Sequence, residues 1–250
     1  MFEFLTLPER TGKPRESGLT HVLDKGLSLE QARQFLEVAG PYVDIVKLGW
    51  GTAVVTPNVK DKIALYQSHD IPVSFGGTFF EVCLRQGKFD DYLTLVDECG
   101  MTCVEISDGT IEMDEADKLA IIRELSTKYK VLSEVGSKDD SVVITPSRWV
   151  ELIGCEIEAG AWKVITEGRE SGTVGIYRPN GDIKDGLLKE IAETLDTSRI
   201  LFEAPVKKQQ AWFIKQFGTN VNLGNIPPEE VISVETLRLG VRGDTLLTFH

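Results

Sequence analysis

Four apolar runs in this 250-residue chain each end in a glutamate followed by small or polar residues, and these glutamates are Glu105, Glu134, Glu167 and Glu203. Each run is short, rich in β-branched residues and bounded by turn-forming residues, which predicts a buried strand. Amphipathic stretches between the runs predict helices, so the strands would be parallel and their carboxylates would gather at one end of the sheet. Because buried carboxylates need partners, this end should hold metal ions, lysines or arginines and carry the chemistry.

Other polar residues follow the predicted strands and should join the four carboxylates: Asp24, Lys25, Lys47, Ser107, Asp108, Lys138, Arg169, Glu170, Asn222 and Asn225. Oxygen ligands without histidine or cysteine suit a hard cation such as Mg²⁺ rather than zinc or copper. The alternative is that these acids and cations form structural ion pairs. For any single glutamate the two interpretations are equally good, whereas four glutamates together favour a functional site.

The strand-and-helix pattern repeats eight times. Besides the four glutamate strands, strands are predicted at 19–24, 43–49, 72–77 and 220–224, and the later helices near 114–128, 146–159, 184–195, 206–217 and 233–239. Eight such units in one chain of this length predict a single (β/α)8 TIM barrel. An open doubly wound sheet is the alternative, but no G-x-G-x-x-G turn follows the first strand. In a barrel the loops after the strands build the active site, so the long polar loops 136–144 and 170–182 are candidate lids.

Length and composition limit the class of protein. A chain of 250 residues with 42% hydrophobic residues suits one domain over residues 1–250, with 1–18 as an N-terminal extension that closes the barrel floor or reaches a neighbouring subunit. The net charge of -12 argues against nucleic acid and anionic membranes as partners. No apolar stretch has the length of a membrane span and no secretory signal is present, which predicts a cytoplasmic protein.

Several single residues invite a functional interpretation. The segment 224–231, which begins with Gly224, predicts a short extra helix whose N-terminus could bind phosphate; a plain connecting turn is the favoured alternative. Lys163 should lie deep in its strand or at the wrong end for catalysis, and His21 should be a hydrogen-bonded core histidine. The four cysteines form no C-x-x-C pair, which argues against zinc.

The chain resembles the phosphosulfolactate synthase family in strings that fall on nearly every strand end: L-D-K-G at 23–26, V-K-L-G-W-G-T at 46–52, G-G-T-F-F-E at 76–81, V-E-I-S-D-G at 104–109, E-V-G-S-K at 134–138, E-G-R-E-S-G at 167–172, F-E-A-P at 202–205 and E-T-L-R-L-G-V-R-G-D-T at 235–245. The resemblance implies a (β/α)8 barrel that joins sulfite to phosphoenolpyruvate with Mg²⁺. In methane-forming archaea this reaction begins coenzyme M biosynthesis. It also implies a homo-oligomer, with a trimer as the expected form. Plant heat-stress proteins belong to the same family, so a non-enzymatic stress protein is one alternative, and another Mg²⁺-dependent lyase acting on a small phosphorylated acid is a second.

The implied reaction explains a mouth that mixes carboxylates with cations. Sulfite addition at C3 leaves negative charge that spreads from C2 into the carboxylate and needs a metal ion or cations, and an acid must then protonate C2. The resemblance implies a lysine after the fifth strand, Lys138, as the proton donor. Nearby cations or partial desolvation should lower its pKa.

Two further lysines at the strand ends, Lys25 and Lys47, are the next catalytic candidates. Ser137 stands where archaeal relatives often carry a second lysine, so the resemblance leaves open which lysine donates the proton. For the metal, Glu105 and Glu134 are the first choices and Asp108 and Glu167 the next. Arg169 suits a bidentate grip on phosphate or carboxylate. The remaining predicted substrate-binding residues are Ser107, Asn222, Gly224 and Asn225.

Overall fold

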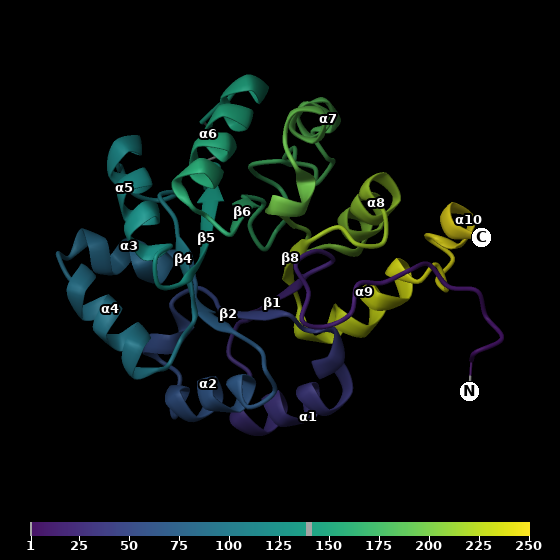
Figure 1. Ribbon diagram of the computed structural model, residues 1–250, viewed down its shortest axis with the longest axis horizontal. Coiled ribbons are helices and arrows are strands. Elements are labelled where there is room, and N and C mark those ends of the chain that lie inside the picture. Colours follow the sequence, from purple (N-terminus) through teal and green to yellow (C-terminus); the bar gives the residue numbers. More distant parts are fainter. Residues whose placement is uncertain (1, 139–141) are drawn as a thin grey trace.

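The computed structural model describes residues 2–138 and 142–250, which form a ring of parallel strands surrounded by helices (Figure 1). The strands are β1 Thr20–Asp24, β2 Ile45–Leu48, β3 Val73–Phe75, β4 Cys103–Ile106, β5 Lys130–Val135, β6 Lys163–Thr166, β7 Ile200–Glu203 and β8 Leu223–Ile226. They lie in the order β3-β2-β1-β8-β7-β6-β5-β4. The ladder therefore joins β1 to β8, and among the described residues only the β3–β4 edge carries no ladder. This nearly closed arrangement confirms the predicted (β/α)8 barrel and excludes the open doubly wound sheet.

The helices follow the strands as the sequence pattern predicts. They are α1 Leu29–Ala39, α2 Val59–Gln67, α3 Gly77–Arg85, α4 Phe89–Glu98, α5 Glu115–Leu125, α6 Pro146–Ala159, α7 Asp185–Thr194, α8 Lys207–Phe217, α9 Val231–Arg238 and the short α10 Leu246–Phe249. Local signals set some of their starts. Ser28 and Gln31 form a capping box at α1, and Thr145 caps α6, which has proline in its first turn.

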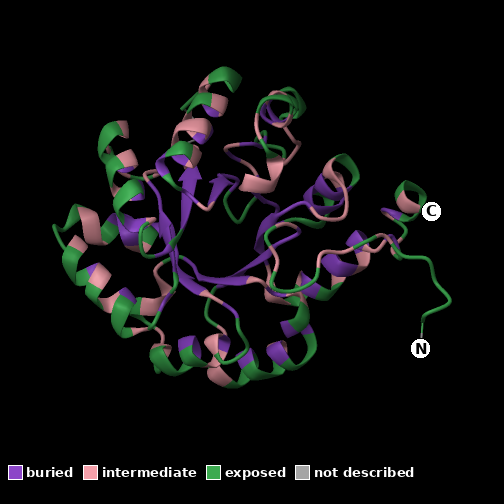
Figure 2. Cartoon of the chain, viewed as in Figure 1, coloured by how far each residue is buried: buried purple, intermediate pink, exposed green. Residues whose placement is uncertain are grey.

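Two apolar layers form the core. The larger lies between the strands and the helices, which turn exposed faces outward (Figure 2). A smaller layer fills the lumen with Leu19, just before β1, and one residue from each of five strands: Ile45, Cys103, Leu132, Ile165 and Leu201. Because side chains in a strand alternate between its faces, the residue two positions further along points into the lumen one layer higher. This is how β2, β4 and β7 bring Lys47, Glu105 and Glu203 to the mouth.

The N-terminal segment lies across the opposite end of the barrel, the floor. Arg10 pairs with Glu235 at 2.9 Å, Arg15 pairs with Asp44 at 3.2 Å, and the backbone oxygen of Glu16 accepts a hydrogen bond from Lys163 Nζ at 2.7 Å. The segment thus covers the floor, while contact with a neighbouring subunit stays a prediction. Lys163 lies at this end, away from the mouth, as predicted.

The structure corrects the position of the last strand. The sequence pattern predicts a strand at 220–224, whereas β8 spans Leu223–Ile226. Asn222 therefore precedes the strand and lies at the floor, where its side chain accepts a hydrogen bond from the Leu19 N–H at 3.0 Å and donates to the carbonyls of Ser198 and Ile200 at 2.9 Å. These three bonds join the starts of neighbouring strands, so Asn222 is a structural residue and the prediction that it binds substrate is wrong.

His21 is also placed differently from its prediction. It is fully buried on β1, as expected of a core residue, but neither ring nitrogen has a hydrogen-bond partner among the described residues. Burial, and then the charge of Lys47, hold the pKa of His21 well below its ordinary value, so the ring is neutral.

No helix in the described part of the chain is both long and apolar enough to cross a membrane.

Candidate active site

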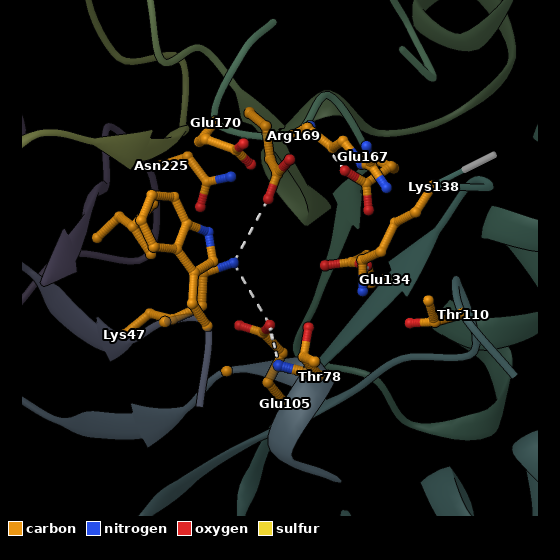
Figure 3. A pocket seen from close by; sticks show the side chains of 16 residues that line it. Lys47, Thr78, Glu105, Thr110, Glu134, Lys138, Glu167, Arg169, Glu170 and Asn225 are labelled. Atoms are coloured by element: carbon orange, nitrogen blue, oxygen red, sulfur yellow. Dashed lines mark hydrogen bonds and ion pairs between the residues drawn. The ribbon is translucent and has the colours of Figure 1, made fainter. Parts of the chain in front are cut away.

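A cavity of about 390 Å³ opens at the carboxyl ends of the strands, above the apolar layer of the lumen (Figure 3). The four strand-end glutamates line it, as the strand pattern predicts, together with Lys47 and Lys138. Arg169 and Asn225 also face this cavity. The loops after β2, β3, β4, β5 and β6 complete its rim, which is where barrel enzymes carry their chemistry.

Lys47 joins the two sides of the cavity. Its Nζ lies 3.4 Å from a carboxylate oxygen of Glu105 on β4 and 3.4 Å from one of Glu203 on β7. Burial alone would lower the pKa of Lys47, but the surrounding carboxylates outweigh burial and raise it above the ordinary value of a lysine. Lys47 therefore carries a positive charge at the bottom of the mouth. The two glutamates are held in turn by backbone N–H groups, Gly77 donating to Glu105 at 2.6 Å and Gly168 to Glu203 at 2.8 Å.

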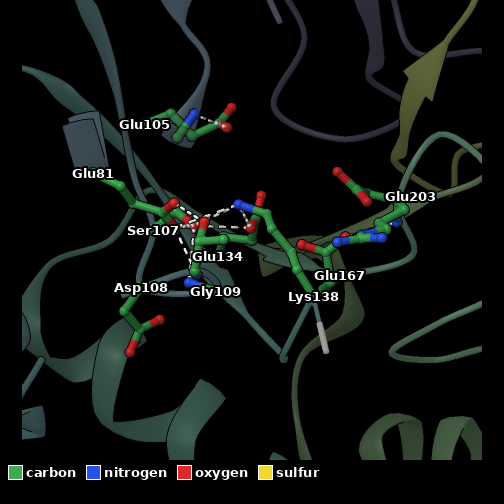
Figure 4. Close-up of polar contacts among 12 residues, drawn as sticks. Glu81, Glu105, Ser107, Asp108, Gly109, Glu134, Lys138, Glu167 and Glu203 are labelled. Atoms are coloured by element: carbon green, nitrogen blue, oxygen red, sulfur yellow. Dashed lines mark hydrogen bonds and ion pairs between the residues drawn. The ribbon is translucent and has the colours of Figure 1, made fainter. Parts of the chain in front are cut away.

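Lys138 enters the mouth from the loop after β5. Its Nζ lies 3.1 Å from Glu134, 3.4 Å from Glu81 and 3.1 Å from the Ser107 hydroxyl (Figure 4). Burial works to lower its pKa, but the glutamates around it raise the pKa above the ordinary value. The prediction of a lowered pKa is therefore wrong for this arrangement, because the groups that contact the ammonium are carboxylates rather than Lys47 or Arg169.

Two carboxyl groups in the mouth influence each other's pKa, those of Glu134 and Glu167. Burial opposes the charge of Glu134, but Lys138 and Lys47 overcome it and lower the pKa of Glu134. Burial, followed by the charges of Glu134 and Glu203, raises the pKa of Glu167 well above its ordinary value. Because two adjacent carboxylates repel each other, a proton taken up by the pair is placed mainly on Glu167. Burial likewise raises the pKa of Glu105 to about 7.

Glu81 is a member of the site that the sequence analysis missed. It lies on α3, is buried, and accepts hydrogen bonds from the Ser107 hydroxyl at 2.6 Å and the Thr110 N–H at 3.3 Å. The string G-G-T-F-F-E at 76–81 contains it, but only the strand-end acids were considered as candidates. The available signal was an acid one helical turn after the glycine that starts α3, on the side that faces the barrel.

Ser107 lies between acids, as its predicted place in the mouth requires. Its hydroxyl bridges Glu81 and Glu134, with oxygen–oxygen distances of 2.6 and 2.9 Å. The hydroxyl has one proton, which it can donate to either of these two carboxyl groups. Ser107 therefore links helix α3 to strand β5 next to Lys138.

Two other predicted site residues lie away from the cavity. Asp108 follows β4 but turns toward α5, where it pairs with Lys118 at 2.8 Å, apart from the group around Lys138 (Figure 4). Lys25 is exposed, and its Nζ lies 5.0 Å above the ring of Trp50 at the rim. Asp108 was predicted to bind metal together with the strand-end glutamates, but the structure does not place it beside them. Lys25, a predicted catalytic residue, is not among the residues that line the cavity.

Arg169 and Asn225 present polar groups to the cavity from strained backbone. Both residues have positive φ, 55° and 53°, which non-glycine residues adopt infrequently. Within the described part of the chain, the Arg169 guanidinium makes no hydrogen bond or ion pair, and the buried Asn225 side-chain oxygen has no donor. Such groups are suited to a bound ligand. Gly224 is needed for packing, because a Cβ there would lie 2.2 Å from Leu201.

The expected phosphate-binding helix is a single turn, η4 Pro228–Glu230, which leads directly into α9. Two consecutive prolines, Pro227 and Pro228, remove N–H groups from the point at which a phosphate would bind. This observation favours the plain connecting turn. Binding of substrate phosphate near Gly224 stays a prediction.

The mouth has enough negative charge to attract a divalent cation, but its described side chains do not form a complete set of metal ligands. No three His, Cys, Asp or Glu residues in the described ranges converge closely enough to hold a metal ion. However, five acids that are buried in the mouth face only two lysines, and Glu105 keeps one buried oxygen that has no donor among the described residues. The acids are Glu81, Glu105, Glu134, Glu167 and Glu203. Since Mg²⁺ commonly uses one or two carboxylates plus substrate oxygens and water, the donor set is compatible with it.

The fold and the ionic mouth at the carboxyl ends of its strands define a (β/α)8-barrel enzyme. The family model described as (2R)-phospho-3-sulfolactate synthase (ComA) matches residues 8–244. The chain therefore belongs to this family and is a carbon–sulfur lyase.

Individual relatives agree with the family match. A phosphosulfolactate synthase from Methanothermobacter thermautotrophicus is 42% identical over 98% of this chain and 97% of its own length. One from Bacillus subtilis is 44% identical over 96% and 97% of the two chains. Among solved structures, 3-hexulose-6-phosphate synthase from Salmonella typhimurium covers 87% of this chain and 96% of its own, with a TM-score of 0.57 and 16% identity, which supports the barrel fold alone.

Proposed function

We propose that this enzyme adds sulfite to phosphoenolpyruvate, with Mg²⁺, to give (2R)-phospho-3-sulfolactate. The observation that carries the proposal is the composition of one cavity, in which buried glutamates, two charged lysines and Arg169, unpaired among the described residues, meet. Cationic side chains are needed to admit two anionic substrates into a protein with a net charge of -12. The excess of acids is needed to hold a divalent cation. Neither requirement alone explains the mixture.

In the proposed reaction the sulfur lone pair of sulfite bonds to C3 of the enol phosphate. The C2–C3 π electrons move to C2 and into the carboxylate, and a proton is then added to C2. Bound Mg²⁺ would supply Lewis-acid stabilisation of the charge on the carboxylate oxygens. Glu105 and Glu134 would supply one or two of its ligands, with substrate oxygens and water as the others, because carboxylate oxygens suit a hard cation.

Two cationic residues would bind and orient the anions. Arg169 would grip the phosphate or the carboxylate in a bidentate manner, since its guanidinium lines the cavity and has no partner in the part of the chain that the structure describes. Lys47, held between Glu105 and Glu203, would present a fixed charge from below. Preorganised charges of this kind stabilise negative charge that develops during the reaction.

Lys138 would protonate C2 from one face of the intermediate. The glutamates around it keep the ammonium protonated, so the proton is present when substrate arrives. The same carboxylates make Lys138 a weak acid until their charge is compensated, which links proton donation to a fully assembled site. The Ser107 hydroxyl and Glu134 would aim the Nζ, because they contact it at 3.1 Å.

The test is a product assay on purified protein with phosphoenolpyruvate, sulfite and MgCl₂, using mass spectrometry and ³¹P NMR. We expect phosphosulfolactate in the wild type and in Lys60→Ala, which removes an exposed lysine that pairs with Glu98 outside the site. No product over a broad pH range from folded protein would refute the proposal. Product formed with another nucleophile but not with sulfite would indicate a different lyase or transferase. A homo-oligomer, with a trimer as the predicted form, would be tested by analytical ultracentrifugation.

A further inference from the structure

A buried lysine lies behind β5, on the side away from the mouth. Lys118 of α5 places its Nζ 2.8 Å from Asp108, 2.7 Å from Glu156 and 2.6 Å from the backbone oxygen of Glu134. An ammonium has three N–H donors, so these three acceptors use all of them. The Lys118 ammonium is thus held in place by hydrogen bonds to three acceptors.

The three acceptors belong to different elements, and one of them is part of the site. Asp108 follows β4, Glu156 lies on α6, and the Glu134 carbonyl belongs to the residue whose carboxylate contacts Lys138. Lys118 therefore holds the end of β5 at the peptide of Glu134, four residues before Lys138.

The chain between Glu134 and Lys138 has little room to move independently of that peptide. Gly136 has φ of +127°, and a Cβ there would lie 2.6 Å from the Glu167 side chain and 2.7 Å from Trp149. The chain therefore passes between two side chains that leave no space for another atom. A displacement of the β5 end would be transmitted to both Glu134 and Lys138.

Stability alone does not explain this network. Buried ion pairs add little net stability compared with apolar residues of similar volume, because desolvation offsets their attraction. A methionine at position 118 would fill a similar volume without charge, but could not bond the Glu134 carbonyl. What the network adds is a defined position for that carbonyl.

We propose that Lys118 is a positioning residue, which fixes the Glu134 carboxylate and the Lys138 ammonium relative to each other through the backbone of β5. The effect on catalysis rests on the proposed function, whereas the effect on the geometry of the mouth does not.

The chain offers a matched control in Lys62 of α2. Its side chain is also buried, and its Nζ lies 2.8 Å from Asp24 and 3.0 Å from the backbone oxygen of Leu27. Lys62 thus has the same kinds of partner, a carboxylate and a carbonyl. It lies behind β1, and neither of these partners, Asp24 and Leu27, is among the described residues that line the cavity. Lys62→Met should therefore reproduce the general effect of removing a buried ammonium, but not the local effect at Lys138.

The experiment compares Lys118→Met, Lys62→Met and wild type. Lys138 is labelled with an amine-reactive acetylating reagent under native conditions, and its rate of modification is measured by peptide mass spectrometry; kcat and KM for phosphoenolpyruvate are measured separately. Loss of a hydrogen bond from a charged donor corresponds to about tenfold in local opening. We expect Lys118→Met to label about tenfold faster at Lys138 and to lose kcat by a similar factor with little change in KM. Lys62→Met should match the wild type in both.

A second variant tests the same inference if Lys118→Met does not fold. Glu156→Gln keeps the side-chain volume but weakens the grip on Lys118, and should change Lys138 labelling in the same direction by a smaller factor. The inference is overturned if the folded Lys118 or Glu156 variant labels Lys138 no faster than Lys62→Met, or if Lys62→Met accelerates labelling equally. Wild-type protein that forms no product would refute the proposed function, and the labelling result would still decide the role of Lys118.

Discussion

Replacing Glu105 with glutamine is expected to stabilise the protein at alkaline pH and to flatten the pH dependence of its stability. Burial raises the pKa of Glu105 from 4.5 to about 7 in the folded state. A carboxyl group with a raised pKa stabilises the fold while it is protonated. That contribution is complete below the unfolded pKa of 4.5 and is lost as the pH rises through about 7. Glutamine stays neutral and can still accept the hydrogen bond from Gly77.

The size of the effect follows from the two pKa values. Over the full range the shift corresponds to about 3.4 kcal/mol, of which roughly 2.5 kcal/mol falls between pH 5 and pH 8. Glu167 and Glu203 also have raised pKa values, so the wild type should lose stability over this range for several reasons. The informative quantity is therefore the difference between wild type and mutant in their change from pH 5 to pH 8.

The assay is urea unfolding followed by circular dichroism at both pH values, with EDTA present so that no metal contributes. Glu98→Gln is the matched control, because this exposed acid pairs only with Lys60 in the described part of the chain. We expect Glu105→Gln to lose about 2.5 kcal/mol less than wild type on going from pH 5 to pH 8, and Glu98→Gln to behave as wild type. If Glu105→Gln and wild type lose the same amount, Glu105 is ionised in the folded protein over the whole range and the reasoning is wrong.

Three further predictions concern activity. Lys138→Ala should lower kcat by about 10²–10⁴-fold, since it removes a general acid, while circular dichroism shows an intact fold; near-wild-type kcat in Lys138→Arg would instead assign the lysine to charge alone. Arg169→Lys should weaken binding of phosphoenolpyruvate by about 1–3 kcal/mol because the bidentate fork is lost, and unchanged KM and kcat would contradict an anion-binding role. Removal of divalent cations with EDTA should abolish activity and added MgCl₂ should restore it, so full activity of the metal-free protein, verified by elemental analysis, would remove Mg²⁺ from the reaction.

Tertiary contacts decided which polar residues near the strand ends belong to the site. Asp108 and Ser107 are adjacent in sequence, yet Ser107 lies among the mouth carboxylates and Asp108 pairs with Lys118 on the opposite side. Glu81 comes from a helix, so no strand pattern could include it. The predicted direction of the pKa shift of Lys138 was wrong for a similar reason. A pKa depends on which charges meet across the barrel, and sequence spacing does not supply that information.

The sequence by itself determined the barrel, the acids at the ends of its strands and the placement of Lys163 away from the mouth. These features follow from local alternation and from the rule that parallel strands end at one edge, which act over short stretches of chain. The tertiary structure alone decided the start of β8, and with it the position of Asn222 at the floor, because strand register depends on pairing with β1 and β7. It also decided that Lys47 meets Glu105 and Glu203, residues 58 and 156 positions away, since only closure of the barrel brings their charges within 3.4 Å.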